Sequence, residues 1–154
     1  MAADRPGEPR RYEVLAVRYA TRRARRHEFF HHWESYGEPD VEVEMAYYFW
    51  VLRAGGETIL VDTGFDPAVG TRRGRTLVCE PVEALRRAGV EPDSVSTVII
   101  THFHYDHIGN IAAFPGAALV APRRELELLV EVDRVGGEHH VAVRRRDDRH
   151  QLTG

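Results

Sequence analysis

A ten-residue run rich in histidine, Thr101–Asn110, constrains the fold of this chain more than any other segment. The run reads Thr-His-Phe-His-Tyr-Asp-His-Ile-Gly-Asn and directly follows the apolar stretch Val98–Ile100, which has the character of a buried strand. Side chains spaced by two at the end of a strand share one face, so His102 and His104 can converge on one ion. Imidazole nitrogens and carboxylate oxygens are the donors that zinc-like metals prefer.

The same run contains the donors for a second ion. Asp106 and His107 lie about one turn beyond the first two histidines and can reach an ion beside the first. The alternative is a histidine-rich surface loop without a metal. Four titratable groups at the end of a buried strand are costly to bury without a metal or a hydrogen-bond network. The pattern therefore predicts a metal-dependent hydrolase.

Size and composition are those of one ordinary globular domain. The chain has 154 residues, of which 43% are hydrophobic and 29% charged, and its formal net charge is −3. This charge favours neither a nucleic-acid nor a membrane partner, although the basic cluster at 22–26 keeps nucleic-acid binding open as a weak alternative. No apolar run is long enough to cross a bilayer, and residues 1–11 lack a signal-peptide core. Because Cys79 is the single cysteine, we expect a cytoplasmic protein without disulfides.

The pattern of apolar residues predicts alternating strands and helices after residue 58, and hence the α/β class. Strands are expected at 12–19, 41–53, 58–61, 95–100 and 117–121, and helices at 81–88, 108–113 and 122–132. The second half of 41–53 is continuously apolar, which predicts burial on both faces. Residues 65–76, rich in glycine and arginine, are expected to form a loop.

Two segments give the chain a clear resemblance to the metallo-β-lactamase superfamily of metal-dependent hydrolases. Residues 101–109 match its histidine signature, and Ile-Leu-Val-Asp-Thr-Gly at 59–64 matches its upstream strand-and-turn motif. Within the superfamily, N-acyl homoserine lactonases are most similar, on residues 47–50, on the loop after residues 62–65 and on residues 124–127. The resemblance covers about residues 12–129 and implies a four-layered αββα sandwich.

The resemblance also implies a role for each residue of the motif. His102 and His104 would bind the first zinc ion, and Asp106 and His107 the second, while Asp62 would support the site without binding metal directly. The two ions would polarise the carbonyl of a lactone and generate a hydroxide that attacks it. Asp106 is the candidate catalytic residue, since it can pass a proton to the leaving alkoxide.

A small ester or lactone is therefore the expected partner, with N-acyl homoserine lactones favoured. Another ester, a thioester or a β-lactam remains an alternative, because substrate choice depends on loops.

The later part of the chain departs from the family pattern. The further histidines and the bridging aspartate that complete the two metal shells in the superfamily are not recognisable after His107. We therefore expect a disordered lead-in at 1–11, the N-terminal half of the fold at 12–132, and a charged tail at 133–154, with a shifted reading frame as one hypothesis for this tail. Such a half-domain would expose one apolar sheet face, which favours self-association. Its status as an enzyme stays open, and a weakly active or inactive remnant is the alternative function.

Overall fold

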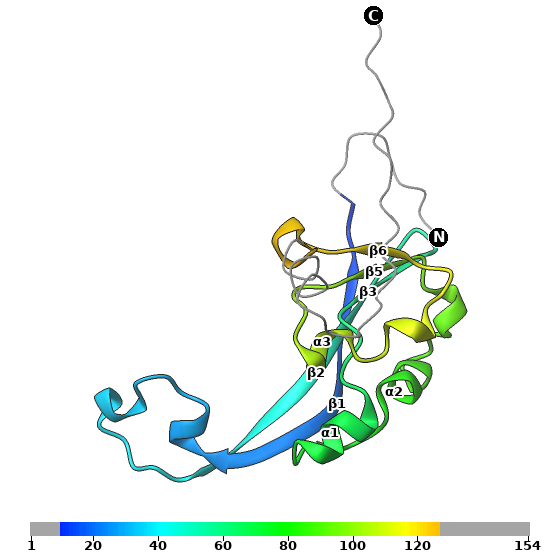
Figure 1. Cartoon of the computed structure of the whole chain (residues 1–154). Coiled ribbons are helices and arrows are strands. Elements are labelled where there is room, and N and C mark those ends of the chain that lie inside the picture. Colours follow the sequence, from blue (N-terminus) through cyan, green and yellow to red (C-terminus); the bar gives the residue numbers. More distant parts are fainter. Residues whose placement is uncertain (1–9, 127–154) are drawn as a thin grey trace, which may run out of the picture.

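The computed structural model describes residues 10–126, which form a mixed six-stranded sheet in the order β4-β1-β2-β3-β5-β6 (Figure 1). The antiparallel pairs are β1–β2, β1–β4 and β2–β3, whereas β5 is parallel to both β3 and β6. This arrangement confirms the expected α/β class with a mixed sheet. The strands are β1 Glu13–Arg25, β2 Glu42–Ala54, β3 Glu57–Val61, β4 Thr76–Leu77, β5 Thr97–Ile99 and β6 Ala118–Val120.

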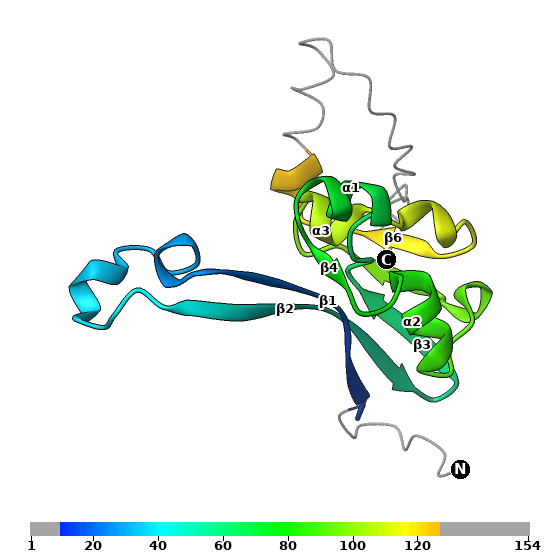
Figure 2. The same cartoon turned by 90° about the horizontal axis from the view of Figure 1, so that it is seen from below.

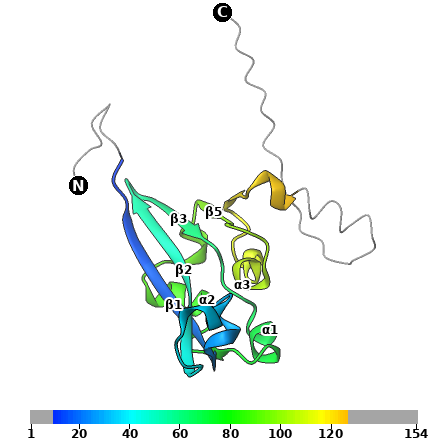
Figure 3. The same cartoon turned by 90° about the vertical axis from the view of Figure 1, so that its left-hand side faces the viewer.

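Three short α-helices pack on one side of this sheet (Figure 3). They are α1 Pro67–Arg72, α2 Pro81–Arg87 and α3 Tyr105–Ile108, and the 3-10 turns are η1 Arg26–Glu28, η2 Trp33–Tyr36, η3 Pro92–Ser94 and η4 Ile111–Ala113. The expected helix at 81–88 is confirmed as α2, with Pro81 in its first turn and Gly89 just beyond its end at a φ of 75°. Its buried Leu85 faces the sheet.

The loop prediction for 65–76 is wrong, because this segment contains helix α1. The carboxylate of Asp66 accepts a hydrogen bond from the backbone N–H of Val69 at 3.0 Å, and Pro67 occupies the first helical turn. An aspartate cap followed by proline is a strong helix start. The glycine and arginine content of the segment obscured this signal.

The helix predicted at 108–113 is also displaced. In the structure α3 begins three residues earlier, at Tyr105, and is followed by a break at Gly109 and the 3-10 turn η4. A Cβ atom at Gly109 would lie 2.2 Å from the backbone nitrogen of Asp66, so α3 can approach this segment only with glycine there. As a result, Asp106 and His107 belong to a helix and not to an extended loop.

A long β1–β2 hairpin projects from the body of the molecule and carries η1 and η2 at its tip (Figure 2). β1 runs well past the expected strand at 12–19 and includes residues 22–25 of the basic cluster, whereas Arg26 begins η1. Within this arm, Arg23 pairs with Glu44 across the strands and Arg26 pairs with Glu38. The arm therefore carries carboxylates beside its arginines.

The two faces of β2 differ sharply, so the prediction that its second half is buried on both faces is wrong. Phe49 and Val51 are 1% and 0% exposed, whereas Tyr48 and Trp50 are 44% and 45% exposed. Successive residues of a strand point to opposite faces, and the described helices cover only one of them. The aromatic run at 47–50 is thus divided between the core and the outer face.

The outer face is apolar across four neighbouring strands. Trp50 on β2 is paired with Val61 on β3, which is paired with Ile99 on β5, and Ile99 is paired with Val120 on β6. Within residues 10–126 no element covers this row. The buried core lies on the opposite face, beneath the helices.

Some sequence predictions fall at the limits of the described chain. Residues 123–126 are helical, as expected for the start of the helix at 122–132, but the rest of that helix lies outside the described residues. The charged tail at 133–154 and most of the lead-in at 1–11 also lie outside them. None of the helices in the described range is long and apolar enough to span a membrane.

Candidate metal centre

The predicted site residues gather at the carboxyl ends of β3 and β5. These strands are parallel neighbours, so the segments that follow them leave the same edge of the sheet. The backbone N–H of Asp62, which follows β3, donates to the carbonyl of Ile99 at the end of β5 at 2.8 Å. This bond places Asp62 directly beside the start of the histidine run.

Asp62 is the buried anchor of the site, with 5% of its surface exposed. Its carboxylate accepts hydrogen bonds from the backbone N–H of Thr101 at 2.8 Å and from the Thr101 hydroxyl at 2.9 Å. It also accepts one from Nδ1 of His107 at 2.8 Å. The φ angle of Asp62 is 62°, an uncommon left-handed conformation for a residue other than glycine, which clusters at functional sites when the surroundings enforce it.

All four predicted metal donors lie together beside this anchor. Nε2 of His102 is 3.0 Å from Nδ1 of His104, and the rings of His102 and His107 are 3.8 Å apart between centroids. Nε2 of His107 lies 3.7 Å from a carboxylate oxygen of Asp106. The structure therefore brings together His102, His104, Asp106 and His107, with Asp62 behind them.

The donor set fits zinc in kind, since it offers three imidazoles and one carboxylate. Among residues 10–126, however, no three such side chains are arranged as a closed group around one point. Two imidazole nitrogens bound to one tetrahedral zinc would lie roughly 3.3 Å apart, slightly farther than the 3.0 Å between His102 and His104. Metal binding would thus require these rings to separate slightly.

The hydrogen bond between Asp62 and His107 shifts both pKa values. Burial opposes ionisation of Asp62, but hydrogen bonds from His107 and Thr101 outweigh it and hold the pKa of this carboxyl below its usual value. Burial likewise opposes the charged form of His107, yet the bond to Asp62 and the nearby charge of Asp106 raise its pKa. A carboxylate that holds Nδ1–H of a histidine leaves Nε2 directed toward a metal.

The pKa of His102 moves in the opposite direction. Burial and the proximity of His107 and His104 lower the pKa of His102, so its neutral form is favoured. A neutral imidazole is the form that binds metal ions. The direction of this shift suits the metal-binding role predicted for His102.

Two residues, Thr101 and Asn110, support the site without having been assigned a role from sequence. The Thr101 hydroxyl connects Asp62 to the ring nitrogens of His102 and His107. The side-chain amide of Asn110 donates to the carbonyl of Thr63 at 2.9 Å, which ties the end of the histidine run to the turn after β3. Thr101 and Asn110 are the first and last residues of the histidine run, so their position could have indicated a supporting role from sequence.

A tyrosine cluster lies beneath the start of α3. Tyr19, which is fully buried at the β1 bulge, donates its hydroxyl to the carbonyl of Asp106 at 3.2 Å. Burial raises the pKa of Tyr19, and burial together with hydrogen bonding to Tyr105 raises the pKa of Tyr47 to about 12. Both phenols therefore stay neutral near pH 7. Because Tyr19 lies 87 positions before Asp106, no local pattern in the sequence could reveal this contact.

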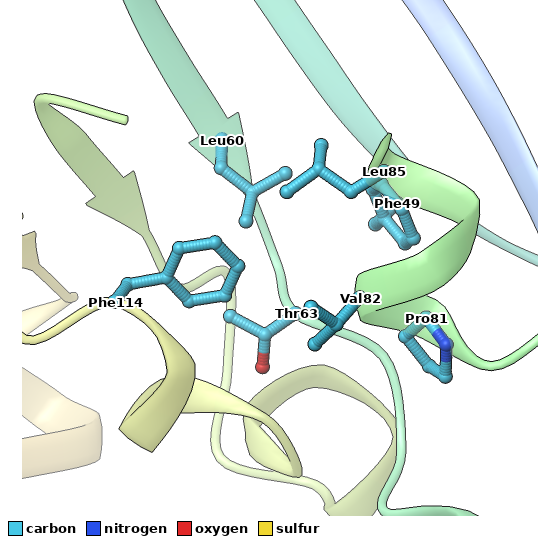
Figure 4. A pocket seen from close by; sticks show the side chains of 7 residues that line it. All are labelled: Phe49, Leu60, Thr63, Pro81, Val82, Leu85 and Phe114. Carbon is cyan, nitrogen blue, oxygen red and sulfur yellow. The ribbon is translucent and has the colours of Figure 1, made fainter. Parts of the chain in front are cut away.

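An apolar pocket lies close to the turn after β3 but does not contain the histidines. It is lined by Phe49, Leu60, Thr63, Pro81, Val82, Leu85 and Phe114 (Figure 4). These side chains come from the covered face of the sheet, from α2 and from the segment after η4. Thr63 is the one polar member, and its hydroxyl donates to the carbonyl of His107 at 3.0 Å. The pocket is thus part of the core behind the site.

Comparisons with known proteins agree with this geometry. The N-acyl homoserine lactonase AiiB of Agrobacterium fabrum (strain C58 / ATCC 33970) is 29% identical over 100 residues, which cover 56% of this chain and 36% of that protein. Metallo-beta-lactamase domain-containing protein 1 of Mus musculus is 50% identical over 62 residues, covering 40% and 20%. The chain thus spans only about a third or less of these relatives in the matched regions.

Solved structures show the same fold. A quorum-quenching N-acyl homoserine lactone lactonase matches with a TM-score of 0.60 at 21% identity, over 76% of this chain and 48% of that one. AidC, a dizinc quorum-quenching lactonase in complex with a product, matches with a TM-score of 0.57 at 17% identity, over 80% and 46%. The chain spans about half the length of these structures.

The family match covers most of the chain. Residues 44–148 match the metallo-beta-lactamase superfamily, a range that includes both the Asp62 turn and the complete histidine run. The boundaries expected for the half-domain and its tail stay a prediction, because the match also extends into 133–148. The combination of this match, the fold and the clustered donors shows that the chain belongs to the metallo-β-lactamase superfamily.

Proposed function

We propose that this chain supplies the first metal-binding segment of a zinc-dependent hydrolase that opens the ring of N-acyl homoserine lactones. The observation that carries the proposal is the convergence of His102, His104, Asp106 and His107 at the ends of β3 and β5. His102 and His104 would hold one ion, and Asp106 and His107 the other. When bound, the metals would supply Lewis acidity and an acidified water.

Asp62 and Thr101 would prepare His107 for its role. The Asp62 carboxylate holds Nδ1–H of His107 at 2.8 Å, which fixes the tautomer and the orientation of the ring. The Thr101 hydroxyl and backbone N–H donate to the same carboxylate and keep it in place. Asp62 therefore orients His107 instead of binding the metal itself.

Asp106 is the proposed proton carrier. One of its carboxylate oxygens lies 3.7 Å from Nε2 of His107, within the group of donors, and its backbone is held by Tyr19. From this position the carboxylate would take up the proton that the attacking water loses and pass it to the leaving alkoxide of the opened ring.

The choice of a lactone as substrate is supported by relatives rather than by pocket shape. AiiB is named an N-acyl homoserine lactonase, and the structural neighbour AidC is described as a dizinc lactonase with its product bound. The mouse relative has only a domain name, which leaves a different ester, a thioester or a β-lactam as the competing substrate class.

Metal content and substrate turnover test this proposal together. The purified chain is loaded with zinc, analysed for metal per chain, and assayed against an acyl homoserine lactone, a thioester and a chromogenic β-lactam. We expect metal binding that is lost in a His102→Ala/His104→Ala variant, and turnover of the lactone that Asp106→Asn reduces by at least about a hundredfold, as for loss of a general acid–base.

The matched control changes two other adjacent histidines. His31 and His32, with ring centroids 4.0 Å apart, lie between η1 and η2, the two turns at the tip of the arm that projects from the body of the molecule (Figure 2). A His31→Ala/His32→Ala variant should keep the metal content and turnover of the wild type. Equal metal loss in both double variants would contradict the assignment of the site.

A second candidate function is a metal-binding remnant without useful turnover. It is favoured by the donor count, because four side chains shared by two ions leave each ion short of a stable shell, and by the lack of a closed three-ligand group in the described range. Substoichiometric zinc and no hydrolysis of any of the three substrates would support this candidate over the lactonase.

A further inference from the structure

Arg75 lies in the turn between α1 and β4 and reaches the helix that carries two of the proposed ligands. Its Nε donates to the hydroxyl of Tyr105 at 2.9 Å, and its Nη1 donates to the carbonyl of Arg73 at 2.8 Å. Gly74, between the two arginines, has a φ of 67° that lets the chain reverse here. Two donors of one planar guanidinium are thus used at once, which fixes its orientation.

Tyr105 is the contact point, and it stands between the proposed ligands His104 and Asp106. Its ring stacks on buried Phe65, with centroids 6.1 Å apart, and the Arg73 guanidinium lies 4.2 Å from its centroid. Stacking restrains the plane of the ring, and the hydrogen bond from Arg75 restrains its outer end. The side chain of Tyr105 is therefore held on its faces and at its tip.

Helix α3 depends on such external contacts. It has four residues, and helices this short are not stable by themselves because nucleation costs more than one turn of hydrogen bonds returns. The start of α3 is held by Arg75 on Tyr105 and by Tyr19 on the Asp106 carbonyl, and its end by the Thr63 N–H, which donates to the His107 carbonyl at 2.7 Å.

We propose that Arg75 is a positioning residue that acts through Tyr105 to set the first turn of α3, and thereby the placement of Asp106 and His107 opposite His102 and His104. The inference rests on the proposed metal centre. Arg75 is not a ligand, and its charge attracts the Asp106 carboxylate from the side of the turn. A side chain far from the histidine run in sequence would thus control the second metal position.

Cobalt titration provides the test, because the visible absorption of Co²⁺ reports both its affinity and its coordination geometry. The spectra of the wild type, Arg75→Ala, Arg75→Lys and Tyr105→Phe are compared, with competition by Zn²⁺. We expect Arg75→Ala and Tyr105→Phe each to weaken metal binding by about 10-fold or more, which is the lower end of the range for loss of a contact that supports a metal ligand. Both variants should also change the shape of the cobalt absorption band.

The conservative variant and the double variant separate positioning from charge. Arg75→Lys keeps the positive charge but cannot donate from two fixed positions, so it should not restore the wild-type spectrum. The double variant Arg75→Ala/Tyr105→Phe should bind metal about as well as Tyr105→Phe alone, because loss of the Tyr105 hydroxyl already breaks the contact with Arg75. Additive losses would contradict action through Tyr105.

Arg72 offers a matched control in the same segment. It is exposed at the end of α1, and the structure shows no hydrogen bond or ion pair of its side chain with another residue of the described range. Arg72→Ala removes the same charge and should leave the cobalt spectrum and affinity unchanged. Thermal unfolding of every variant, followed by circular dichroism, shows whether a lost spectrum reflects loss of the fold.

The outcomes distinguish this inference from the proposed function. If the wild type binds no cobalt or zinc, the proposed function fails and the positioning role fails with it. If the wild type binds metal and Arg75→Ala binds it with the same affinity and spectrum, only the role of Arg75 is overturned. In a chain with turnover, a rise in KM at constant kcat would instead indicate that Arg75 contacts the substrate.

Discussion

The two faces of the sheet are built from the same strands but have opposite surroundings. On the covered face, Phe49 and Leu60 pack under α2 and are each 1% exposed. On the outer face, their neighbours Trp50 and Val61 form part of an apolar row that no described element covers. The two faces are similar in apolar character, so composition alone does not distinguish them.

The difference between the faces explains where the site lies. The helices of the covered face are attached to the strand ends through the turns that contain Asp62 and the histidine run, so their packing also positions the metal donors. The outer face has no such attachment within the described residues. Stability and site geometry are therefore coupled on one face only, and substitutions can test this separation.

The largest expected effect compares two adjacent aromatic residues. Phe49→Ala should lower the free energy of unfolding by about 3–5 kcal/mol, because a fully buried ring leaves a cavity. Trp50→Ala, on the other face, should cost less than about 1 kcal/mol, since its side chain is already half exposed. Urea denaturation of both variants measures the difference. Equal losses would show that the outer face is covered in solution.

The close approach of α3 to the turn after Phe65 should give the next largest effect. Gly109→Ala would place a Cβ 2.2 Å from the backbone nitrogen of Asp66, which cannot move as a side chain would. We expect a loss of about 3 kcal/mol, at the upper end for overpacking. Gly116→Ala is the control, because nothing lies within 4 Å of its added Cβ. Thermal unfolding should separate the two variants by several degrees.

A substitution at Asp62 tests whether the buried anchor of the site also contributes to the stability of the fold. Asp62→Asn keeps the shape but replaces a charged acceptor of bonds from Thr101 and His107, which should cost about 2 kcal/mol in the metal-free protein. Asp93→Asn in the exposed turn η3 should be neutral within about 0.5 kcal/mol. Chemical denaturation without metal measures the free energy of unfolding of both variants. An unchanged value for Asp62→Asn would show that the charge of this carboxylate does not stabilise the fold.

Self-association through the outer face stays a prediction of the sequence, and it is the smallest effect that we expect. Sedimentation of the chain over a range of concentrations should show reversible association. Trp50→Arg, which places a charge in the middle of the apolar row, should weaken it by about tenfold, or about 1.4 kcal/mol. Val78→Arg, an exposed position outside this row, is the control. A wild type that stays monomeric at every concentration would refute the prediction.

Local patterns predicted the elements that depend on local physics. The strands near 41–53, 58–61, 95–100 and 117–121 and the helix at 81–88 are present, because period-two alternation, apolar runs, and proline and glycine at helix ends act within a few residues. The missed α1 also had a local signal, the Asp66 cap before Pro67, which the glycine and arginine content of the segment obscured. The misplaced helix at 108–113 had another origin. The break at Gly109 reflects contact with Asp66, more than forty positions earlier, which has no local signature.

The features of the candidate site likewise fall into those that the sequence determined and those that only the tertiary structure decided. The sequence by itself determined the superfamily, the donor types and their order, since His102, His104, Asp106 and His107 lie within six positions and follow a buried strand. Tertiary structure decided which nitrogen of His107 is held by Asp62, how Tyr19 and Arg75 hold α3, and which sheet face the elements within residues 10–126 cover. These features depend on contacts between segments that are distant in the sequence. Such contacts form only when the parallel pairing of β3 and β5 brings the strand ends together.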